Sequence, residues 1–208
     1  MTVSWIKHRF AGGVLALDTA NTVVLRGHAG KTFDRFDDAG EIARFADAAS
    51  VFRAKELGDR KLAAPNPRQI APEVLAIREA TDRLFRGAAS TGGMAADDLS
   101  AFLTACAAGL HGKDVQVGHP GRPFGDPATP IAFEAALAVS ALSLLAGDSL
   151  ARMRICPNCN WLFLDKSRNS SRLWCDMAVC GNRRKASRHY HRKVADKSTR
   201  DIREAGNA

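Results

Sequence analysis

Four cysteines near the C-terminal end constrain this chain more than any other feature. They are spaced C-x2-C-x15-C-x4-C, at Cys156, Cys159, Cys175 and Cys180. Thiolates three residues apart can face one tetrahedral ion when the chain between them turns tightly, and Pro157-Asn158 supplies residues that favour such a turn. Asn160 follows and tolerates the left-handed backbone conformation that this turn often needs. The pattern predicts one structural zinc ion, because four protein ligands leave no open position for water or substrate.

Two disulfides are the alternative for the same four residues. Disulfides require an oxidising compartment, and residues 1–10 contain no apolar run of signal-peptide length behind a charged start. No segment approaches the run of about eighteen apolar residues that a membrane span needs. We therefore expect a cytoplasmic protein with a metal site and no membrane partner. The fifth cysteine, Cys106, lies in an apolar helical stripe and is predicted to be a small core residue.

Charge is unevenly distributed along the 208 residues. Residues 1–150 hold 16 Lys and Arg against 17 Asp and Glu, whereas residues 151–208 hold 14 against 5, so the two parts carry −1 and +9. A zinc ion with four thiolates has a formal charge of about −2, which leaves residues 151–208 with a net charge of about +7. Such a positive field indicates a polyanionic partner, with nucleic acid ahead of an acidic protein or a membrane surface.

The residues around the cysteines resemble a known family. Cys156-Pro157-Asn158-Cys159 and the closing Cys180-Gly181-Asn182-Arg183 are similar to the CGNR zinc finger, named for those last four residues. Near the other end, Leu17-Asp18-Thr19-Ala20-Asn21-Thr22 resembles the L-D-x-x-N-T signature of the ABATE domain, which usually precedes this finger. The resemblance implies a bacterial stress-induced transcription regulator.

The patterning predicts an α+β fold that is mainly α. A helical N-terminal domain with a small β-sheet is expected over residues 1–150, and a small zinc finger with a knuckle, a β-hairpin and a helix over residues 151–208. Residues 5–35 are interpreted as extended structure and turns, with the signature around Leu17 in a strand. The predicted helices run from Asp38 to Gly58, from Pro72 to Arg86, from Leu99 to Leu110 and from Ile131 to Ala146. A short strand is predicted over residues 113–118, and Asp38 and Glu41 as a capping box.

The segment after Gly181 is rich in arginine and predicts a helix with one thin apolar seam. Spacing of about 100° per residue separates its basic side chains into two groups. The face opposite the seam and its flank carry the expected nucleic-acid contacts, which are Arg184, Lys185, Arg188 and Arg192. Arg183 lies beside the seam instead and is expected to pair with Asp165 or to hydrogen-bond a cysteine sulfur. The alternative for the whole face is simple solvation, and the nearby His189 and His191 are not needed as metal ligands.

The N-terminal signature offers a second candidate site. Asp18, Asn21 and Thr22 could line a small-molecule pocket, which would make this domain a sensor for an effector, although the same side chains also cap turns. No glycine-rich phosphate loop, nucleophile elbow or acid/base pair is recognisable, so no enzyme is expected. The sequence is best interpreted as a DNA-binding transcriptional regulator with a sensor or oligomerisation domain. The alternatives are a zinc module that binds RNA or protein, and an enzyme with its site in the N-terminal domain.

Overall fold

The computed structural model describes residues 2–113, 124, 126, 128–186 and 190. Within them the chain is mainly helical with three small sheets, which confirms the predicted fold class. The helices are α1 (Leu15–Ala20), α2 (Gly40–Phe52), α3 (Ala54–Leu57), α4 (Pro67–Thr91), α5 (Ala96–Leu110) and α6 (Phe133–Ser143). The strands are β1 (Val23–Val24), β2 (Phe33–Asp34), β3 (Leu62–Ala63), β4 (Ile131–Ala132), β5 (Met153–Ile155) and β6 (Leu162–Leu164).

The N-terminal region departs from the expected extended structure. Residues Lys7–Phe10 form a 3-10 turn, and the signature lies in helix α1 rather than in a strand. All six residues of α1 are buried, and a fully buried run has no polar face that would distinguish a helix from a strand in the sequence. The predicted small sheet does follow, as the antiparallel pair of β1 and β2.

Helices α2 and α3 confirm the helix predicted from Asp38, but the expected capping box is wrong. The N-cap of α2 is Ala39, and the Asp38 carboxylate accepts a hydrogen bond from the N–H of Gly40 at 2.9 Å. The Glu41 carboxylate instead accepts bonds from the N–H of Val3 at 2.8 Å and from Nε1 of Trp5 at 2.9 Å. Glu41 therefore fastens the N-terminal segment to α2, a long-range contact that a local pattern cannot reveal.

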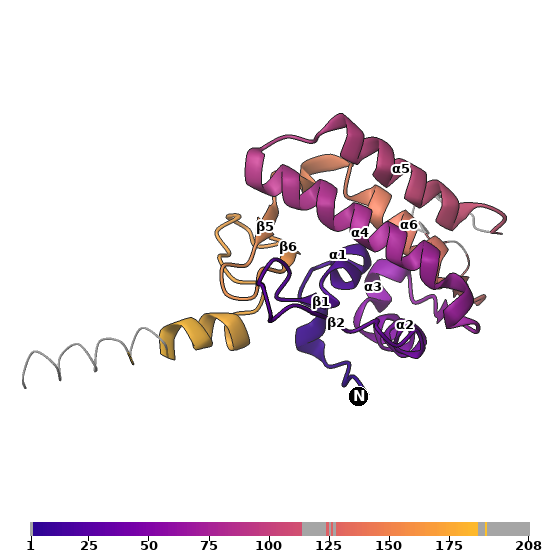
Figure 1. Ribbon diagram of the computed structural model, residues 1–208, viewed down its shortest axis with the longest axis horizontal. Helices are drawn as coiled ribbons and strands as arrows, with labels where there is room; N and C mark the ends of the chain where they lie inside the picture. The colour runs from indigo at the N-terminus through magenta and orange to yellow at the C-terminus, as the bar shows by residue number, and fades with distance from the viewer. Residues whose placement is uncertain (1, 114–123, 125, 127, 187–189, 191–208) are drawn as a thin grey trace, which may run out of the picture.

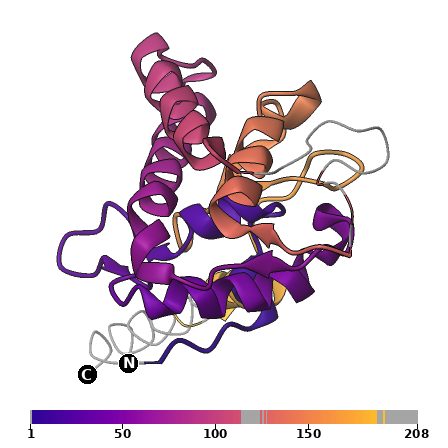
Figure 2. The same ribbon diagram turned by 90° about the vertical axis from the view of Figure 1, so that its right-hand side faces the viewer.

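Helices α4, α5 and α6 form a layer in which α5 runs back along α4 and α6 packs against both (Figures 1 and 2). Helix α4 extends beyond the prediction at both ends, because Pro67 suits its first turn and Gly92, with φ of 82°, closes it in the left-handed conformation. Helix α6 starts two residues later than predicted. Ile131–Ala132 is instead a strand that pairs in parallel with Leu62–Ala63.

The core lies between this layer and the shorter helices. Its largest buried side chains are aromatic, with Phe45 against Phe133 at 5.8 Å and Phe85 against Phe102 at 5.6 Å between ring centroids. Cys106 is buried in the same cluster, which confirms its predicted role, and burial raises the pKa of its thiol to about 12. No helix in the described part of the chain is long and apolar enough to cross a membrane. The strand predicted over residues 113–118 lies, apart from Lys113, outside the described residues.

Candidate metal centre

The first two cysteines lie in the turn of a β-hairpin. Strands β5 and β6 pair antiparallel, with Ile155 opposite Leu162, and the knuckle connects them. The N–H of Asn160 donates to the carbonyl of Cys156 at 2.9 Å, and the N–H of Cys156 donates to the carbonyl of Trp161 at 2.8 Å. Asn160 has φ of 62°, the left-handed conformation predicted for it. The hairpin therefore aims Cys156 and Cys159 at one point.

The second pair is presented by a short helical turn, Met177–Gly181. Asp176 caps this turn by accepting hydrogen bonds from the N–H groups of Ala178 at 2.8 Å and Val179 at 3.2 Å. Cys175 directly precedes the cap and Cys180 lies within the turn, so both thiols face the knuckle.

The four sulfur atoms all lie within 4.8 Å of one another. The Sγ of Cys175 is 3.5 Å from that of Cys159 and 3.6 Å from that of Cys180. Four ligands at the usual Zn–S distance of about 2.3 Å would place neighbouring sulfurs about 3.8 Å apart, so the cluster fits one tetrahedral zinc ion. None of the four cysteines is in a disulfide. Hydrogen bonds among the thiols lower the pKa of Cys156 and raise the pKa of Cys159 and Cys175, so a bound cation, rather than these hydrogen bonds, would stabilise four thiolates.

The site is closed and structural in character. Cys156, Cys175 and Cys180 are buried, and Trp161 and Phe163 pack around them. A four-thiolate zinc ion in such a site has no free coordination position, so it would supply folding free energy rather than chemistry.

The loop between the two cysteine pairs is organised by Asp165 and by an arginine that the sequence analysis missed. The buried Asp165 carboxylate accepts hydrogen bonds from the N–H groups of Ser167 and Arg172, both at 2.8 Å. The Arg172 side chain donates to the carbonyls of Trp174, at 2.8 Å, and Cys175. Its Cζ lies 5.2 Å from the centroid of the Phe163 ring.

Arg183 does not take the expected place. Its side chain is exposed, and it forms no ion pair with Asp165 within the described residues. Backbone N–H groups already occupy both oxygens of Asp165, so that carboxylate needs no arginine. The guanidinium that supports the cysteine loop belongs to Arg172. A single arginine within a polar loop gave no sequence signal.

Of the two roles left open for the N-terminal signature, the contacts of its side chains favour the structural one. Asp18 and Asn21 are buried, and so is Thr22. The Asp18 carboxylate accepts from the N–H of Gly12 at 2.8 Å and from Nε of Arg53 at 2.5 Å. Because their polar atoms are engaged by the protein, these side chains form an internal network rather than the lining of a small-molecule pocket.

Asn21, a member of this network, is hydrogen-bonded directly to the finger. The Asn21 side chain donates from Nδ2 to the carbonyl of Leu162 at 2.8 Å, and its Oδ1 accepts from the N–H of Leu162 at 3.0 Å. The Thr22 hydroxyl donates to the carbonyl of Thr19 at 2.8 Å and accepts from Nη1 of Arg78 at 3.1 Å. Asn21 thus binds strand β6 of the finger to the end of α1.

Further contacts join the finger to the helical part. The N–H of Leu164 donates to the carbonyl of Gly12 at 2.8 Å, and Nδ2 of Asn160 donates to the carbonyl of Arg26 at 2.7 Å. The imidazole of His8 stacks on Trp161, with 5.4 Å between ring centroids. Met153, Leu162 and Leu164 belong to the same apolar cluster as the helices. The hairpin is therefore built into the main core.

Part of the predicted basic surface follows the metal site. Residues 182–186 continue as a helix that extends away from the helical layer (Figure 1). Arg184 and Lys185 are exposed on it, next to Arg183. The other two expected contacts, Arg188 and Arg192, lie outside the described residues, as do His189 and His191.

The hairpin, the cysteine turn and the closed four-thiol cluster define a zinc-finger protein with a helical N-terminal part. Two family models match the chain. The CGNR zinc finger matches residues 152–193, and the ABATE family, described as "Putative stress-induced transcription regulator", matches residues 13–148. The second match spans more than half of the sequence, so the chain belongs to the ABATE family and carries a CGNR zinc finger at its C-terminal side. This confirms the resemblance seen in the sequence. No curated protein matches the chain significantly.

Proposed function

We propose that this protein is a cytoplasmic transcriptional regulator that binds DNA through the basic helix after its zinc finger. The observation that carries the proposal is the position of Arg183, Arg184 and Lys185. They are exposed at the start of a helix that leaves the body of the molecule (Figure 1). Residues 181–193 contain six Lys or Arg and no Asp or Glu. A segment of this composition can approach phosphates without competition from acidic side chains of its own.

In this proposal, zinc has a structural task. The ion would hold Cys175 and Cys180 against the knuckle and so fix the direction in which the basic helix starts. Residues 1–150 would act as the regulatory domain and residues 151–208 as the DNA-binding one. The family description supports a regulator, and the closed metal site assigns no catalytic chemistry to the zinc.

The direct test is binding of the zinc-loaded protein to fluorescent duplex DNA, measured by anisotropy. The parent should bind, and alanine at Arg184, Lys185, Arg188 and Arg192 together should abolish binding while zinc content stays unchanged. Equal binding by both proteins would reject the proposal.

A specific observation favours one second candidate, which is a protein-binding finger. Leu173 is 69% exposed and Met177 is 55% exposed, and both lie on the finger. Exposed apolar side chains of this size are common at protein contacts. A partner held there would form a stoichiometric complex that is insensitive to nuclease, which separates it from an RNA- or DNA-bridged complex.

A further inference from the structure

A cavity lies between the N-terminal segment, strand β2 and the start of α2. Its volume is about 480 Å³, within the range of small-molecule sites. The residues that carry the argument are Val3, Arg9, Phe33 and Arg35, all of which line it. Neither Asp18 nor any cysteine of the metal site lines this cavity.

Arg9 is a cation without a hydrogen-bond partner in the described part of the chain. Its Nη1 atom is buried and unpaired, and its Cζ lies 5.7 Å from the ring centroid of Trp5. Burial lowers the pKa of Arg9, although the charge of Glu41 opposes the shift. A buried donor without an acceptor costs free energy and calls for an explanation, such as a ligand.

Arg35 lies in the same cavity and is nearly as poorly paired. The only hydrogen bond of its side chain among the described residues is from Nη1 to the carbonyl of Asn21, at 3.3 Å. Its Cζ lies 5.7 Å from the ring of Phe33 and 5.5 Å from the ring of Trp161. Burial, and then the nearby charge of Arg9, lowers the pKa of Arg35 to about 10. Two guanidinium groups therefore line one cavity, and the charge of Arg9 disfavours the charge of Arg35.

The charges of Glu41 and Asp34 oppose the burial that lowers the pKa of Arg9 and Arg35 respectively, but neither carboxylate forms an ion pair with these two arginines within the described residues. Arg78 holds the two oxygens of Asp34 at 2.7 and 2.6 Å. Glu41 is occupied by the N-terminal segment and by Arg44. The remaining carboxylates of the lining are exposed, and they are Asp37 and Asp38. Arg9 and Arg35, both half-buried, are thus the cations of the lining that no carboxylate contacts directly within the described residues.

We propose that this cavity binds a small organic oxyanion, with its carboxylate or phosphate group held by Arg9 and Arg35. Guanidinium groups match the geometry of both anions and donate several charge-assisted hydrogen bonds. The rest of the ligand would lie along Val3 and Phe33. Arg35 also contacts Trp161, a residue of the finger, and Asn21, which is bonded to Leu162 of the finger, so an occupant would act on the finger. Only that last consequence rests on the proposed DNA-binding function.

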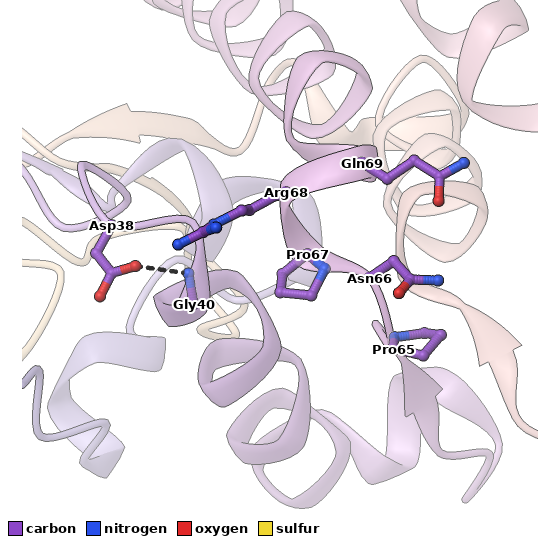
Figure 3. Close-up of a pocket in the computed structure, with 7 residues that line it drawn as sticks. All are labelled: Asp38, Gly40, Pro65, Asn66, Pro67, Arg68 and Gln69. Atoms are coloured by element: carbon purple, nitrogen blue, oxygen red, sulfur yellow. Dashed lines mark hydrogen bonds between the residues drawn. The ribbon is translucent and has the colours of Figure 1, made fainter.

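The neighbouring depression provides a comparison. It lies between the start of α2 and the start of α4, and Arg68 extends across it toward Asp38 and Gly40 (Figure 3). Arg68 is exposed and the Asp38 carboxylate is occupied by the N–H of Gly40. A solvated arginine needs no ligand, so Arg68 is a matched control for the arginines of the cavity.

The test uses the zinc-loaded full chain without DNA. Inorganic phosphate and succinate are each titrated against sodium chloride at equal ionic strength, with tryptophan emission and calorimetry as readouts, because Trp5 and Trp161 lie against the two arginines. A saturable response to either anion is expected. A response to phosphate alone indicates phosphate esters as natural ligands, a response to succinate alone indicates carboxylates, and each of these supports the site.

Variants make the test decisive. Arg9→Gln should weaken anion binding about tenfold or more, since it removes charge-assisted bonds, while Arg68→Gln should leave the affinity unchanged. The side chain of Arg9 makes no hydrogen bond within the described residues, so its variant should retain zinc and fold. Arg35→Gln provides the second measurement. The proposal is overturned if neither anion gives a saturable response, or if Arg9→Gln and Arg35→Gln bind as tightly as the parent. DNA is absent, so neither result depends on the proposed DNA binding.

Discussion

The side-chain amide of Asn21 is paired with the backbone of Leu162 through two hydrogen bonds, one to its carbonyl and one from its N–H. Both residues are buried, and 141 positions separate them in the chain. The amide thus pairs with the backbone of β6 as a residue of a neighbouring strand would, and β6 is part of the finger. This pairing explains why an asparagine stands in the signature at that position, because its side-chain amide offers a donor and an acceptor side by side, as the backbone does.

Asn21→Ala should destabilise the protein by about 2–4 kcal/mol, because it leaves a buried N–H and a buried carbonyl of Leu162 without partners. Chemical denaturation would measure the loss. Asn21→Asp should be as damaging, since a carboxylate cannot donate to the carbonyl. Asn66→Ala, at an exposed asparagine, is the control and should change stability little. A fully stable Asn21→Ala variant would show that the pairing of Asn21 with Leu162 contributes nothing to the free energy of unfolding.

Arg172→Ala should weaken zinc retention, because the Arg172 guanidinium fixes the carbonyls of Trp174 and Cys175 beside the metal. Competition with a chromophoric chelator would measure this, and we expect a loss of about tenfold, in the range known for groups that orient metal ligands. Arg183→Ala is the matched control and should retain zinc as the parent does, because Arg183 is exposed. The opposite ranking of the two variants would restore Arg183 to the supporting role that the sequence suggested.

The sequence was sufficient for features with local causes. The cysteine spacing predicted one compact cluster, the apolar periodicity predicted α2, α4, α5 and α6, and the position after the knuckle predicted the left-handed Asn160. In each case the cause lies within a few residues of the feature.

The expectations from the sequence were wrong where residues distant in the chain determine the local structure or the hydrogen-bond partner. Helix α1 is buried on all sides, so its sequence has no alternation of apolar and polar residues that would distinguish a helix from a strand. Glu41 accepts hydrogen bonds from Val3 and Trp5 rather than from the start of its own helix, and Asp18 accepts one from Arg53. Polar residues in a signature look the same whether they bind a ligand or the protein itself. Only the fold shows which acceptors and donors reach them.

Chelation of zinc should loosen the cysteine turns while the β5–β6 hairpin stays protected. Met153, Leu162 and Leu164 pack in the helical core, so this hairpin does not depend on metal alone. Hydrogen exchange should therefore rise after EDTA in residues 156–160 and 165–181, with little change in α4 and α6. Rapid exchange throughout the helices would mean that zinc holds the whole fold.

Asp18 should make stability pH-dependent. Burial, which outweighs the attraction of Arg53, raises the pKa of its carboxyl from 3.8 to about 6. The folded state then binds the proton more tightly than the unfolded state, so this contribution is present below pH 3.8 and is lost as pH rises through about 6. Relative to Asp18→Asn, the unfolding free energy of the parent should fall by about 1–3 kcal/mol across that window. A constant difference between the two proteins would contradict the shift.

DNA binding, if it uses the basic helix, should depend steeply on salt. Contacts from Arg184, Lys185, Arg188 and Arg192 to about four phosphates predict a log-log slope of affinity against salt of about −3 to −4. An alanine at a residue that contacts a phosphate should flatten the slope by about one unit. A residue that reads a base should instead cost about 1–3 kcal/mol and relax the sequence preference.

The matched control for this series is Arg68→Ala, since Arg68 is an exposed arginine on α4 outside the finger. It changes the net charge by the same amount as each single variant in the helix. If binding responds only to overall charge, all single variants should behave alike. If the helix is the contact surface, Arg184→Ala and Lys185→Ala should flatten the slope while Arg68→Ala leaves it unchanged. Equal slopes for the parent and the quadruple alanine variant, with zinc retained, would remove DNA from the function of this helix.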